Sequence, residues 1–540
     1  MVAIIQEQTP APAAEAQEES PILGSRVTSR LLADLLKLVP SAGDEVETIP
    51  VQIPFTGHTL GATPRCTAAT VEMAVRRASR IQQLWRERSF GERAKVFLRY
   101  HDLILDRQDE ILDLIQLETG KARRHAFEEV LDVANVCRYY ALNAERHLGV
   151  RRRKGALPGL TAAKEYHHPR GVVGFIAPWN YPLSMSMTDA IPALMAGNGV
   201  VLKPDQQTPF TALWAVRLLQ EAGLPLDLFQ VVTGRGSELG GTLIANVDFI
   251  AFTGSTATGR IIAAQAAERL IGCSLELGGK NAMIVMADAD LDEAVEGAIR
   301  GSFNNTGQLC ISIERLYIQR QIYDRFVTRF AARAEEMTFG TELNYEVDLG
   351  SLASRQQLDV VVDHVEDALA KGAKILAGGR PRPDIGPYFF EPTVLEGVTN
   401  AMVVSTAETF GPVVAVYPFD DDDEAIERAN ASEYGLNASL WTADTTKGEE
   451  MATRIEAGTV NINESYIAAW ASMDAPMGGF KNSGLGRRHG AEGILKYTES
   501  QTVATQRLHP IAAPDGIEEE SYSRVMTSAL WLLKRIPGIR

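Results

Sequence analysis

The sequence predicts an α/β protein whose first large unit is a doubly wound parallel sheet and whose second is an α/β unit of similar size. Apolar runs of strand length alternate with amphipathic runs of helix length from residue 171 onward. The first predicted strands are 172–177, 199–203, 228–232 and 249–252, and the helices after them are 184–197, 209–222, 236–245 and 257–271. Strand, helix and strand in this rhythm form right-handed βαβ units, which assemble a parallel sheet between layers of helices.

The segment before residue 171 is predicted to be mostly helical. Residues 1–24 are rich in Ala, Pro, Glu and Gln, a composition typical of a disordered tail. Apolar residues then recur at helical spacing, which predicts helices at 27–39, 67–85, 94–117 and 127–146. Gly120 follows the third of these helices and is expected to end it. Residues 149–166 contain a basic run and a Pro/Gly turn and are predicted to form a connecting ribbon.

The alternation of strand and helix continues after Glu276. The predicted strands lie at 282–286 and near 314–318, 391–395, 412–418, 438–442 and 458–462, and the predicted helices at 290–302, 320–337 and 355–371. This pattern again favours βαβ units, so we expect a second α/β unit here.

Composition excludes several classes of protein. The chain has 540 residues, of which 45% are hydrophobic, so it can bury more than one core. A net charge of −16 argues against a nucleic-acid-binding surface, which would be basic. No run of 18 apolar residues occurs, and the N-terminus lacks the charge and length of a secretory signal. The four cysteines form no Cys-x-x-Cys pair, so we expect no metal site and a reducing, cytoplasmic location.

Two residues carry the strongest chemical signal. Glu276 opens the run Glu-Leu-Gly-Gly-Lys, and Cys310 ends the run Gly-Gln-Leu-Cys. A thiolate is a strong nucleophile, and a carboxylate within reach can activate water against an acyl-thiol intermediate. Each residue alone also has an ordinary structural interpretation, as a small buried hydrophobe and as a surface charge.

Further polar and glycine-rich segments follow the predicted strands, where ligands of parallel sheets bind. Asn180 ends Pro-Trp-Asn and could bind a developing oxyanion or cap a helix. Lys203 ends the second strand and could meet a ribose or phosphate, or be a solvated lysine. The run Phe252–Arg260 has Arg where a P-loop needs Lys, but its glycine turn could hold a pyrophosphate at a helix N-terminus.

These motifs and their order resemble the aldehyde dehydrogenase superfamily, most closely the bacterial NADP-dependent succinate-semialdehyde dehydrogenase group. The resemblance runs from about residue 48 to 507. It is carried by Phe175–Asn180, Lys203–Gln206, Phe252–Ser255, Glu276–Lys280, Gly307–Cys310, Glu408–Pro412 and Pro476–Gly479.

The resemblance implies a mechanism for three residues. Cys310 would attack the aldehyde, Asn180 would stabilise the oxyanion together with the Cys310 backbone N–H, and Glu276 would activate water to hydrolyse a thioester. Fixed dipoles would stabilise the charge, so no metal is expected. A CoA-acylating relative would not need Glu276. The alternative from another class is a cofactor-free thiol esterase, in which Lys203, Ser255 and Glu408 would have no function.

The resemblance also implies a site for NADP, the preferred cofactor, or NAD. The family commonly has a glutamate at position 206 that binds both ribose hydroxyls, whereas Gln206 carries no charge to repel a 2′-phosphate and leaves Lys203 to pair with it. The residues assigned to the cofactor are Ile176, Ala177, Pro178, Trp179, Lys203, Asp205, Gln206, Gly234, Gly236, Phe252, Thr253, Gly254, Ser255, Gly259, Leu277, Gly278, Glu408 and Phe410.

The substrate prediction stays open between succinate semialdehyde and a longer or aromatic aldehyde. Thr188 and Asn304 stand where succinate-semialdehyde enzymes place two arginines, and neither can pair with a carboxylate as arginine does. The segment before Pro476 is aromatic, which adds Trp470 and Ser472 to the predicted substrate pocket.

The resemblance finally implies a domain organisation and a homodimer or homotetramer. Its parts are a Rossmann-like cofactor domain at 25–147 and 167–275, a catalytic domain at 276–475, a small β oligomerisation flap from bridging segments 148–166 and 476–510, and a tail at 511–540. The apolar and basic tail is too short to span a bilayer. We expect it to pack on a neighbouring subunit or the substrate mouth, in preference to a membrane surface.

Overall fold

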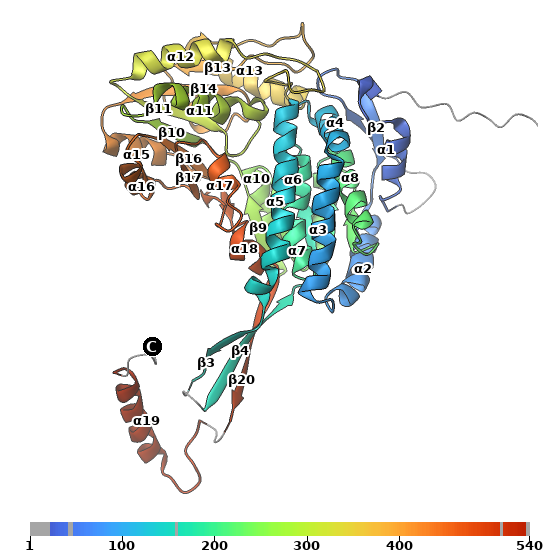
Figure 1. Ribbon diagram of the computed structural model, residues 1–540, viewed down its shortest axis with the longest axis vertical. Coiled ribbons are helices and arrows are strands. Elements are labelled where there is room, and N and C mark those ends of the chain that lie inside the picture. Colours follow the sequence, from blue (N-terminus) through green and yellow to red (C-terminus); the bar gives the residue numbers. More distant parts are fainter. Residues whose placement is uncertain (1–21, 41–46, 157–159, 508–510, 536–540) are drawn as a thin grey trace, which may run out of the picture.

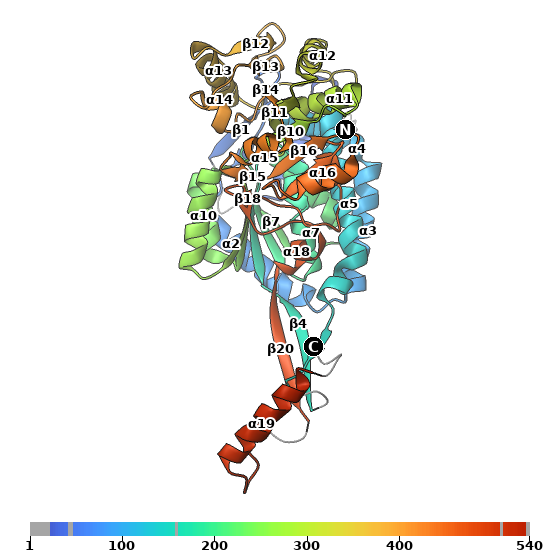
Figure 2. The ribbon, with the colours of Figure 1, turned by 90° about the vertical axis from the view of Figure 1, so that its left-hand side faces the viewer.

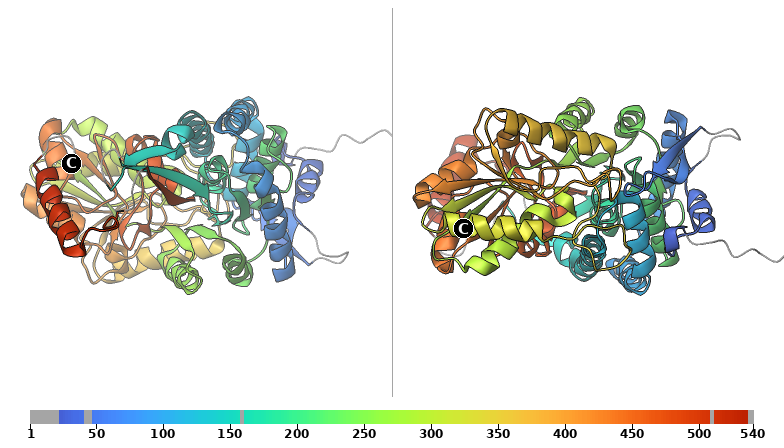
Figure 3. Two further views of the ribbon diagram at one scale, coloured as in Figure 1. Left: turned by 90° about the horizontal axis from the view of Figure 1, so that it is seen from below. Right: turned by 90° about the horizontal axis from the view of Figure 1, so that it is seen from above.

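Two large, mainly parallel sheets organise the chain (Figure 1). The structure is a computed structural model that describes residues 22–40, 47–156, 160–507 and 511–535. Viewed from above and below, the yellow-to-orange segments around the second sheet lie on one side and the blue N-terminal segments on the other (Figure 3). The α/β fold class predicted from the sequence is confirmed. The predicted disordered tail falls largely on residues outside the described ranges.

The first sheet has six strands in the order β19-β9-β8-β5-β6-β7, and only the β19–β9 pair is antiparallel. Their bounds are β5 Val172–Ile176, β6 Gly199–Lys203, β7 Phe229–Val231, β8 Phe249–Thr253, β9 Gly272–Glu276 and β19 Gly484–Leu485. The sequence pattern had not indicated β9 as a strand. The first four strands are apolar and buried almost throughout, as expected for strands covered on both faces.

The order of these strands creates a switch point beside β5. From β5 the chain adds β6 and β7 on one side, then returns to add β8 and β9 on the other. Loops after β5 and β8 therefore diverge and leave a crevice at the carboxyl ends of the strands, where ligands of open α/β sheets bind.

The helices around this sheet correct two predictions. Their bounds are α1 Ser29–Leu36, α2 Ala68–Trp85, α3 Phe90–Asp106, α4 Gln108–Thr119, α5 Arg123–Leu148, α6 Pro182–Met187, α7 Ala190–Met195, α8 Pro209–Glu221, α9 Gly236–Asn246 and α10 Thr256–Glu268. The predicted helix at 94–117 is two helices, divided at Arg107, whose φ and ψ of −109° and 21° are not helical. The predicted helix at 184–197 is also divided, because Pro192 has no N–H to bond the carbonyl of Thr188.

The second sheet has seven strands in the order β12-β13-β14-β11-β10-β16-β17, with only β12 antiparallel to its neighbour. Their bounds are β10 Asn281–Val285, β11 Ile313–Gln319, β12 Lys374–Ala377, β13 Thr393–Glu396, β14 Val413–Phe419, β16 Asn437–Trp441 and β17 Thr459–Ile462. The helices around it are α11 Leu291–Phe303, α12 Tyr323–Glu335, α13 Arg355–Ala370, α14 Val403–Thr406, α15 Asp422–Asn430, α16 Thr445–Ala452 and α17 Ile467–Trp470. Helices α11 and α12 share one apolar core with this sheet, and α15 and α16 share another.

A three-stranded antiparallel sheet of β3, β4 and β20 extends away from the two large sheets (Figure 2). Its bounds are β3 Arg151–Lys154, β4 Thr161–Pro169 and β20 Thr498–Gln506, and α18 Gly490–Leu495 precedes it. The last helix, α19 Glu519–Leu533, lies beyond its far end. The smaller elements are η1 Ile22–Gly24, η2 Asn304–Gly307, β1 Thr48–Gln52, β2 Thr59–Pro64, β15 Tyr434–Gly435 and β18 Phe480–Lys481. None of the helices in the described ranges is both long and apolar enough to cross a membrane.

Candidate active site

A cavity of about 270 Å³ lies between the loops after β5 and β8 and the segment that carries Cys310. Cys310, Glu276 and Asn180 all contribute to its wall. The other lining residues are Glu128, Pro178, Trp179, Tyr181, Met185, Thr253, Gly254, Ser255, Leu277, Gly278, Leu309, Ile311, Gln357, Glu408, Phe410, Leu436, Tyr466, Trp470, Met477 and Arg488. The three predicted catalytic residues, far apart in the sequence, thus line one cavity.

Cys310 is held by an unusual turn of the backbone. Asn305, Thr306 and Gly307 have φ values of 52°, 56° and 70°, three successive residues in the left-handed region. Such strain persists only where surrounding contacts hold it, and here the Asn281 side-chain amide donates to the Cys310 carbonyl at 2.9 Å. A Cβ at position 279 would lie 2.6 Å from the same carbonyl, so only glycine fits this approach.

The Cys310 thiol is protonated in this environment. Burial, helped by the nearby Glu408 and Glu276 carboxyl groups, raises the pKa of the Cys310 thiol to about 12. A thiol becomes a strong nucleophile only when it loses its proton. Reaction at neutral pH therefore requires a base within the cavity.

Glu276 has the properties of such a base. It ends β9, and its Oε1 has no hydrogen-bond partner among the residues that the structure describes. Burial raises the pKa of Glu276 to about 7, while Arg488 and Lys496 oppose that rise. Gly478 has a φ of 156°, and a Cβ there would lie 3.2 Å from Glu276 Oε1, so this glycine leaves room beside the carboxyl group.

Hydrogen bonds hold both the side-chain amide and the backbone carbonyl of Asn180. Its Nδ2 donates to the Gln308 carbonyl at 3.0 Å, and its own carbonyl accepts from Lys121 Nζ at 2.6 Å. Lys121 in turn forms a buried ion pair with Glu129 at 2.8 Å. A primary amide has two N–H donors, so one remains for an oxygen bound next to Cys310.

The predicted cofactor residues fall into two groups. Nine line the cavity: Pro178, Trp179, Thr253, Gly254, Ser255, Leu277, Gly278, Glu408 and Phe410. Glu408 Oε1 accepts from the Gly279 N–H at 2.9 Å, and Phe410 meets Trp179 edge-on at 5.5 Å between ring centroids. The other nine lie outside the cavity wall: Ile176, Ala177, Lys203, Asp205, Gln206, Gly234, Gly236, Phe252 and Gly259.

Lys203 and Gly236 lie close together at the end of β6 and the start of α9. A Cβ at position 236 would lie 3.8 Å from Lys203 Nζ, so glycine leaves room beside this ammonium. Burial lowers the pKa of Lys203, and no hydrogen bond of its ammonium occurs within the described residues. Gln206, three positions after Lys203, is exposed, and the side chain of Ser255 caps the N-terminus of α10. A buried cation beside a glycine and a helix N-terminus suit a dinucleotide phosphate, so these residues fit NAD(P).

The predicted substrate residues are only partly in the cavity. Trp470 lines it, whereas Thr188, Asn304 and Ser472 do not. Thr188 is buried against Arg488, and Asn304 donates to Glu128 at 3.2 Å, so both support lining residues from behind. Ser472 is exposed and donates to the Ala468 carbonyl.

Sequence reasoning missed two charged lining residues, Glu128 and Arg488. Arg488 pairs with Asp189 at 3.3 Å, and Lys496 pairs with the same carboxylate at 3.0 Å. No motif marks either residue. One feature of the sequence could have indicated Glu128. Glu128 and Glu129 are an acidic pair in a helix, between Ala126 and Val130, which are apolar and buried.

Comparisons with known proteins agree on one family. The model of the family described as "Aldehyde dehydrogenase family" matches residues 41–503. A Mycolicibacterium smegmatis protein named "Putative succinate-semialdehyde dehydrogenase", with NADP(+) in its name, is 50% identical over 495 residues, 92% of this chain and 96% of its own. The resemblance noted in the sequence is confirmed.

Solved structures share the fold. A succinate-semialdehyde dehydrogenase from Burkholderia pseudomallei has a TM-score of 0.82 at 35% identity, covering 85% of this chain and 95% of that one. An NAD+ complex of an aldehyde dehydrogenase from Bacillus cereus has a TM-score of 0.83 at 34% identity, covering 89% and 99%.

Proposed function

The chain belongs to the aldehyde dehydrogenase family, and on that basis we propose that it oxidises an aldehyde to a carboxylic acid through a thioester on Cys310. The observation that carries this proposal is the shared cavity of Cys310, Glu276 and Asn180. A thiol, a base and an amide donor around one space are the groups that covalent aldehyde oxidation needs.

The first half of the proposed reaction forms a bond between Cys310 Sγ and the aldehyde carbon. Glu276, with its pKa raised to about 7, is ionised at mildly alkaline pH and can take the thiol proton directly or through water. The carbonyl oxygen becomes an oxyanion, which the free N–H of Asn180 and the backbone N–H of Cys310 stabilise. NAD(P), when bound, would accept the hydride that leaves this carbon, and the carbon would then be a thioester on Cys310.

The second half releases the acid. Glu276 first releases the thiol proton to solvent and then removes a proton from water, the hydroxide attacks the thioester carbon, and the thiolate of Cys310 leaves. The unpartnered Oε1 of Glu276 is free to accept that proton. The Gly478 backbone beside it leaves space for the water.

The proposed cofactor is NADP, with NAD also accepted. The support is the uncharged Gln206, the buried Lys203 ammonium next to Gly236, and the NADP(+) in the name of the M. smegmatis relative. The NAD+ complex of the B. cereus structure supports acceptance of NAD by this fold.

The proposed assembly is a homodimer or homotetramer in the cytoplasm. The three-stranded sheet leaves one edge of β20 without a partner strand in the described chain, and such edges commonly pair with another chain. All four cysteines are free thiols, which a reducing compartment maintains. The proposed substrate is either succinate semialdehyde, as in the relatives' names, or a longer or aromatic aldehyde.

A spectrophotometric assay tests the proposed activity. The purified chain with NADP and a panel of aldehydes should give absorbance of reduced nicotinamide without added CoA. Cys310→Ala should abolish that signal while still binding NADP, because the thiol forms the covalent intermediate. Oxidation by the Cys310→Ala variant at a rate near that of the unmodified chain would contradict the mechanism, and hydrolysis of esters without any cofactor would favour a thiol esterase.

A further inference from the structure

A carboxyl group, Glu128, lies in the wall of the cavity on the side of the aromatic residues. Glu128 comes from α5, and the cavity that it lines is the one that holds Cys310. Its neighbours in the wall include Tyr181, Tyr466 and Trp470. The proposed mechanism makes no use of this carboxyl group, although burying it requires compensation by hydrogen bonds.

Three hydrogen bonds hold the Glu128 carboxyl group. Tyr181 Oη donates to Oε2 at 2.8 Å, while Tyr466 Oη and Asn304 Nδ2 donate to Oε1 at 3.0 Å and 3.2 Å. An ionised carboxylate offers about four acceptor positions, so one position on Oε2 stays open. That position can accept a hydrogen bond from a molecule in the cavity.

Among the described residues no cation forms an ion pair with Glu128, although the charge of Lys121 lowers its pKa. Lys121, on the same helical corner, is paired with Glu129 and also lies 3.8 Å from the Tyr181 ring centroid. Burial raises the pKa of Glu128 to about 7, and the bonds from Tyr181 and Tyr466 limit that rise. Above pH 8 the group is therefore mostly a carboxylate.

The charges around the cavity disfavour an anionic substrate. Among the described lining residues three are carboxylic acids, Glu128, Glu276 and Glu408, and one is a cation, Arg488. All three guanidinium nitrogens of Arg488 are engaged, with Asp189, Thr188 and the Met185 sulfur. A free bidentate arginine, which a substrate carboxylate would need, is absent from this described wall.

We propose that Glu128 is a specificity-determining residue that makes this pocket select hydroxylated aromatic aldehydes over semialdehydes that end in a carboxylate. The substrate hydroxyl would donate to the open position of Glu128, and the ring would lie among Tyr181, Tyr466 and Trp470. The inference rests on the proposed function, because it names the substrate class of that same site.

Matched benzaldehydes test the proposal at pH 8.5 with the full chain and NADP. We expect kcat/KM to fall in the order 4-(hydroxymethyl)benzaldehyde, benzaldehyde, 4-carboxybenzaldehyde, with at least about a tenfold difference between the first and last; the alcohol of the first stays neutral at this pH and can donate. Succinate semialdehyde should also be a poorer substrate than 4-(hydroxymethyl)benzaldehyde. This ranking is measured on the unmodified chain and does not depend on any variant folding.

The variant Glu128→Gln then tests whether Glu128 causes this order of kcat/KM values. Removing the charge should raise kcat/KM for 4-carboxybenzaldehyde about tenfold and lower it for 4-(hydroxymethyl)benzaldehyde, with benzaldehyde changed less than about twofold. Glu145→Gln, which changes an exposed carboxylate on the same helix, is the matched control and should leave the ranking unchanged.

The outcomes separate this inference from the proposed function. If no aldehyde is oxidised, the proposed function fails. If aldehydes are oxidised but 4-carboxybenzaldehyde or succinate semialdehyde is the best substrate, or if a folded Glu128→Gln chain keeps the original ranking, only the selection by Glu128 is overturned.

Discussion

Cys310 and Glu276 share one cavity but differ in how readily each loses its proton. Burial raises both pKa values, to about 12 for the thiol and about 7 for the carboxyl group. Near neutral pH the carboxylate is therefore the group that can accept a proton from the thiol or from water. Two interacting groups titrate as a pair, so a pH profile reports apparent values of the pair.

The deacylation rate should rise with pH through about 7. Glu276 acts as a base only when it is ionised, and its raised pKa delays ionisation beyond the ordinary range of a glutamate. Stopped-flow measurement of reduced cofactor at several pH values would follow this limb. A steady rate that is independent of pH between 6 and 8 would contradict a base of this pKa.

Glu276→Gln should slow the burst of reduced cofactor, keep its amplitude, and lose most of the steady rate. The amide cannot take a proton from water, so the thioester accumulates. Rapid-mixing traces compared with those of the unmodified chain give both quantities. A burst as fast as that of the unmodified chain would contradict Glu276 as the base for Cys310 and leave it a role in deacylation alone.

Gln206→Glu should shift preference from NADP toward NAD. The new carboxylate would accept from ribose hydroxyls and repel a 2′-phosphate beside Lys203, and charge-assisted pairs contribute roughly 1.5–3 kcal/mol. A change of about tenfold or more in the ratio of kcat/KM values follows from that free energy. An unchanged ratio of kcat/KM values would mean that the exposed Gln206 does not discriminate between cofactors with and without the 2′-phosphate.

Buried acidic side chains connect neighbouring helices around the site. Glu129 of α5 accepts from the N–H groups of Leu183 and Ser184 at 2.7 Å and 3.1 Å, at the start of α6. Glu118 of α4 accepts from Phe210 and Thr211, both at 2.7 Å, at the start of α8. Both satisfy backbone donors that a helix N-terminus leaves free.

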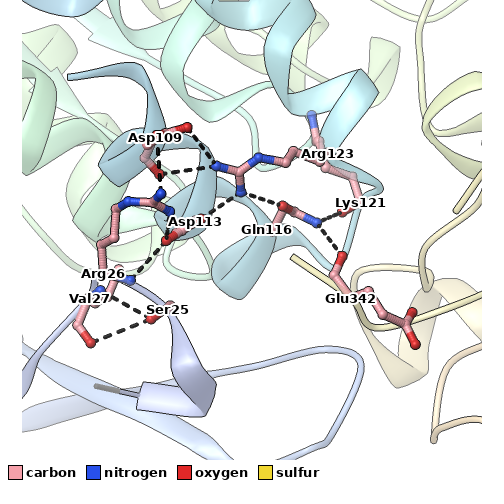
Figure 4. A network of polar contacts seen from close by, with 9 residues as sticks. All are labelled: Ser25, Arg26, Val27, Asp109, Asp113, Gln116, Lys121, Arg123 and Glu342. Atoms are coloured by element: carbon pink, nitrogen blue, oxygen red, sulfur yellow. Dashed lines mark hydrogen bonds and ion pairs between the residues drawn. The ribbon is translucent and has the colours of Figure 1, made fainter. Parts of the chain in front are cut away.

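A polar network fixes the corner between α4 and α5 that carries Lys121 (Figure 4). Asp113 accepts from Arg26 and Arg123, and Gln116 links Arg123 to the carbonyls of Lys121 and Glu342. This corner places the Lys121 ammonium on the Asn180 carbonyl. The position of an oxyanion donor thus depends on contacts that reach as far as the N-terminal segment.

Glu118→Leu should destabilise the folded chain by about 1–3 kcal/mol, because it leaves two buried N–H groups of α8 without an acceptor. The shift of the denaturation midpoint in urea measures this loss. Glu221→Leu, at the other end of α8, removes only an exposed ion pair with Arg107 and should cost less than about 1 kcal/mol. Equal shifts of the denaturation midpoint for the two variants would contradict the helix-capping role of Glu118.

The three-stranded sheet and α19 expose apolar side chains that the two large sheets do not cover. Val503 of β20 is 42% exposed, and Trp531 of α19 is 61% exposed. Both lie in the part of the molecule that extends from the main body (Figure 2). An extension of this kind is consistent with the proposed contact between subunits.

Val503→Asp should weaken the proposed dimer or tetramer, because it places a charge on the exposed face of β20. Sedimentation velocity would show a larger share of monomer than in the unmodified chain. Leu226→Asp changes an apolar side chain that is 70% exposed in the loop between α8 and β7 and serves as the control. A monomeric unmodified chain would contradict the proposed assembly.

The α/β fold and the identity of the family could be read from the sequence. Strands such as Gly199–Lys203 are apolar along their whole length, and local periodicity depends only on neighbouring residues. Motifs around Cys310, Glu276 and Asn180 are contiguous, so their residues could be named before any distance was known. The roles of these three residues stay predictions until the variants are measured.

The composition of the pocket wall was decided by the tertiary structure. Glu128 comes from α5 and Arg488 from the segment after β19, and no local pattern distinguishes them from other charged residues. Conversely, Thr188 and Asn304 were expected in the pocket but lie behind it, in contact with Arg488 and Glu128. Local periodicity indicates which face of an element is buried, but the packing of distant elements decides which buried side chains face a cavity.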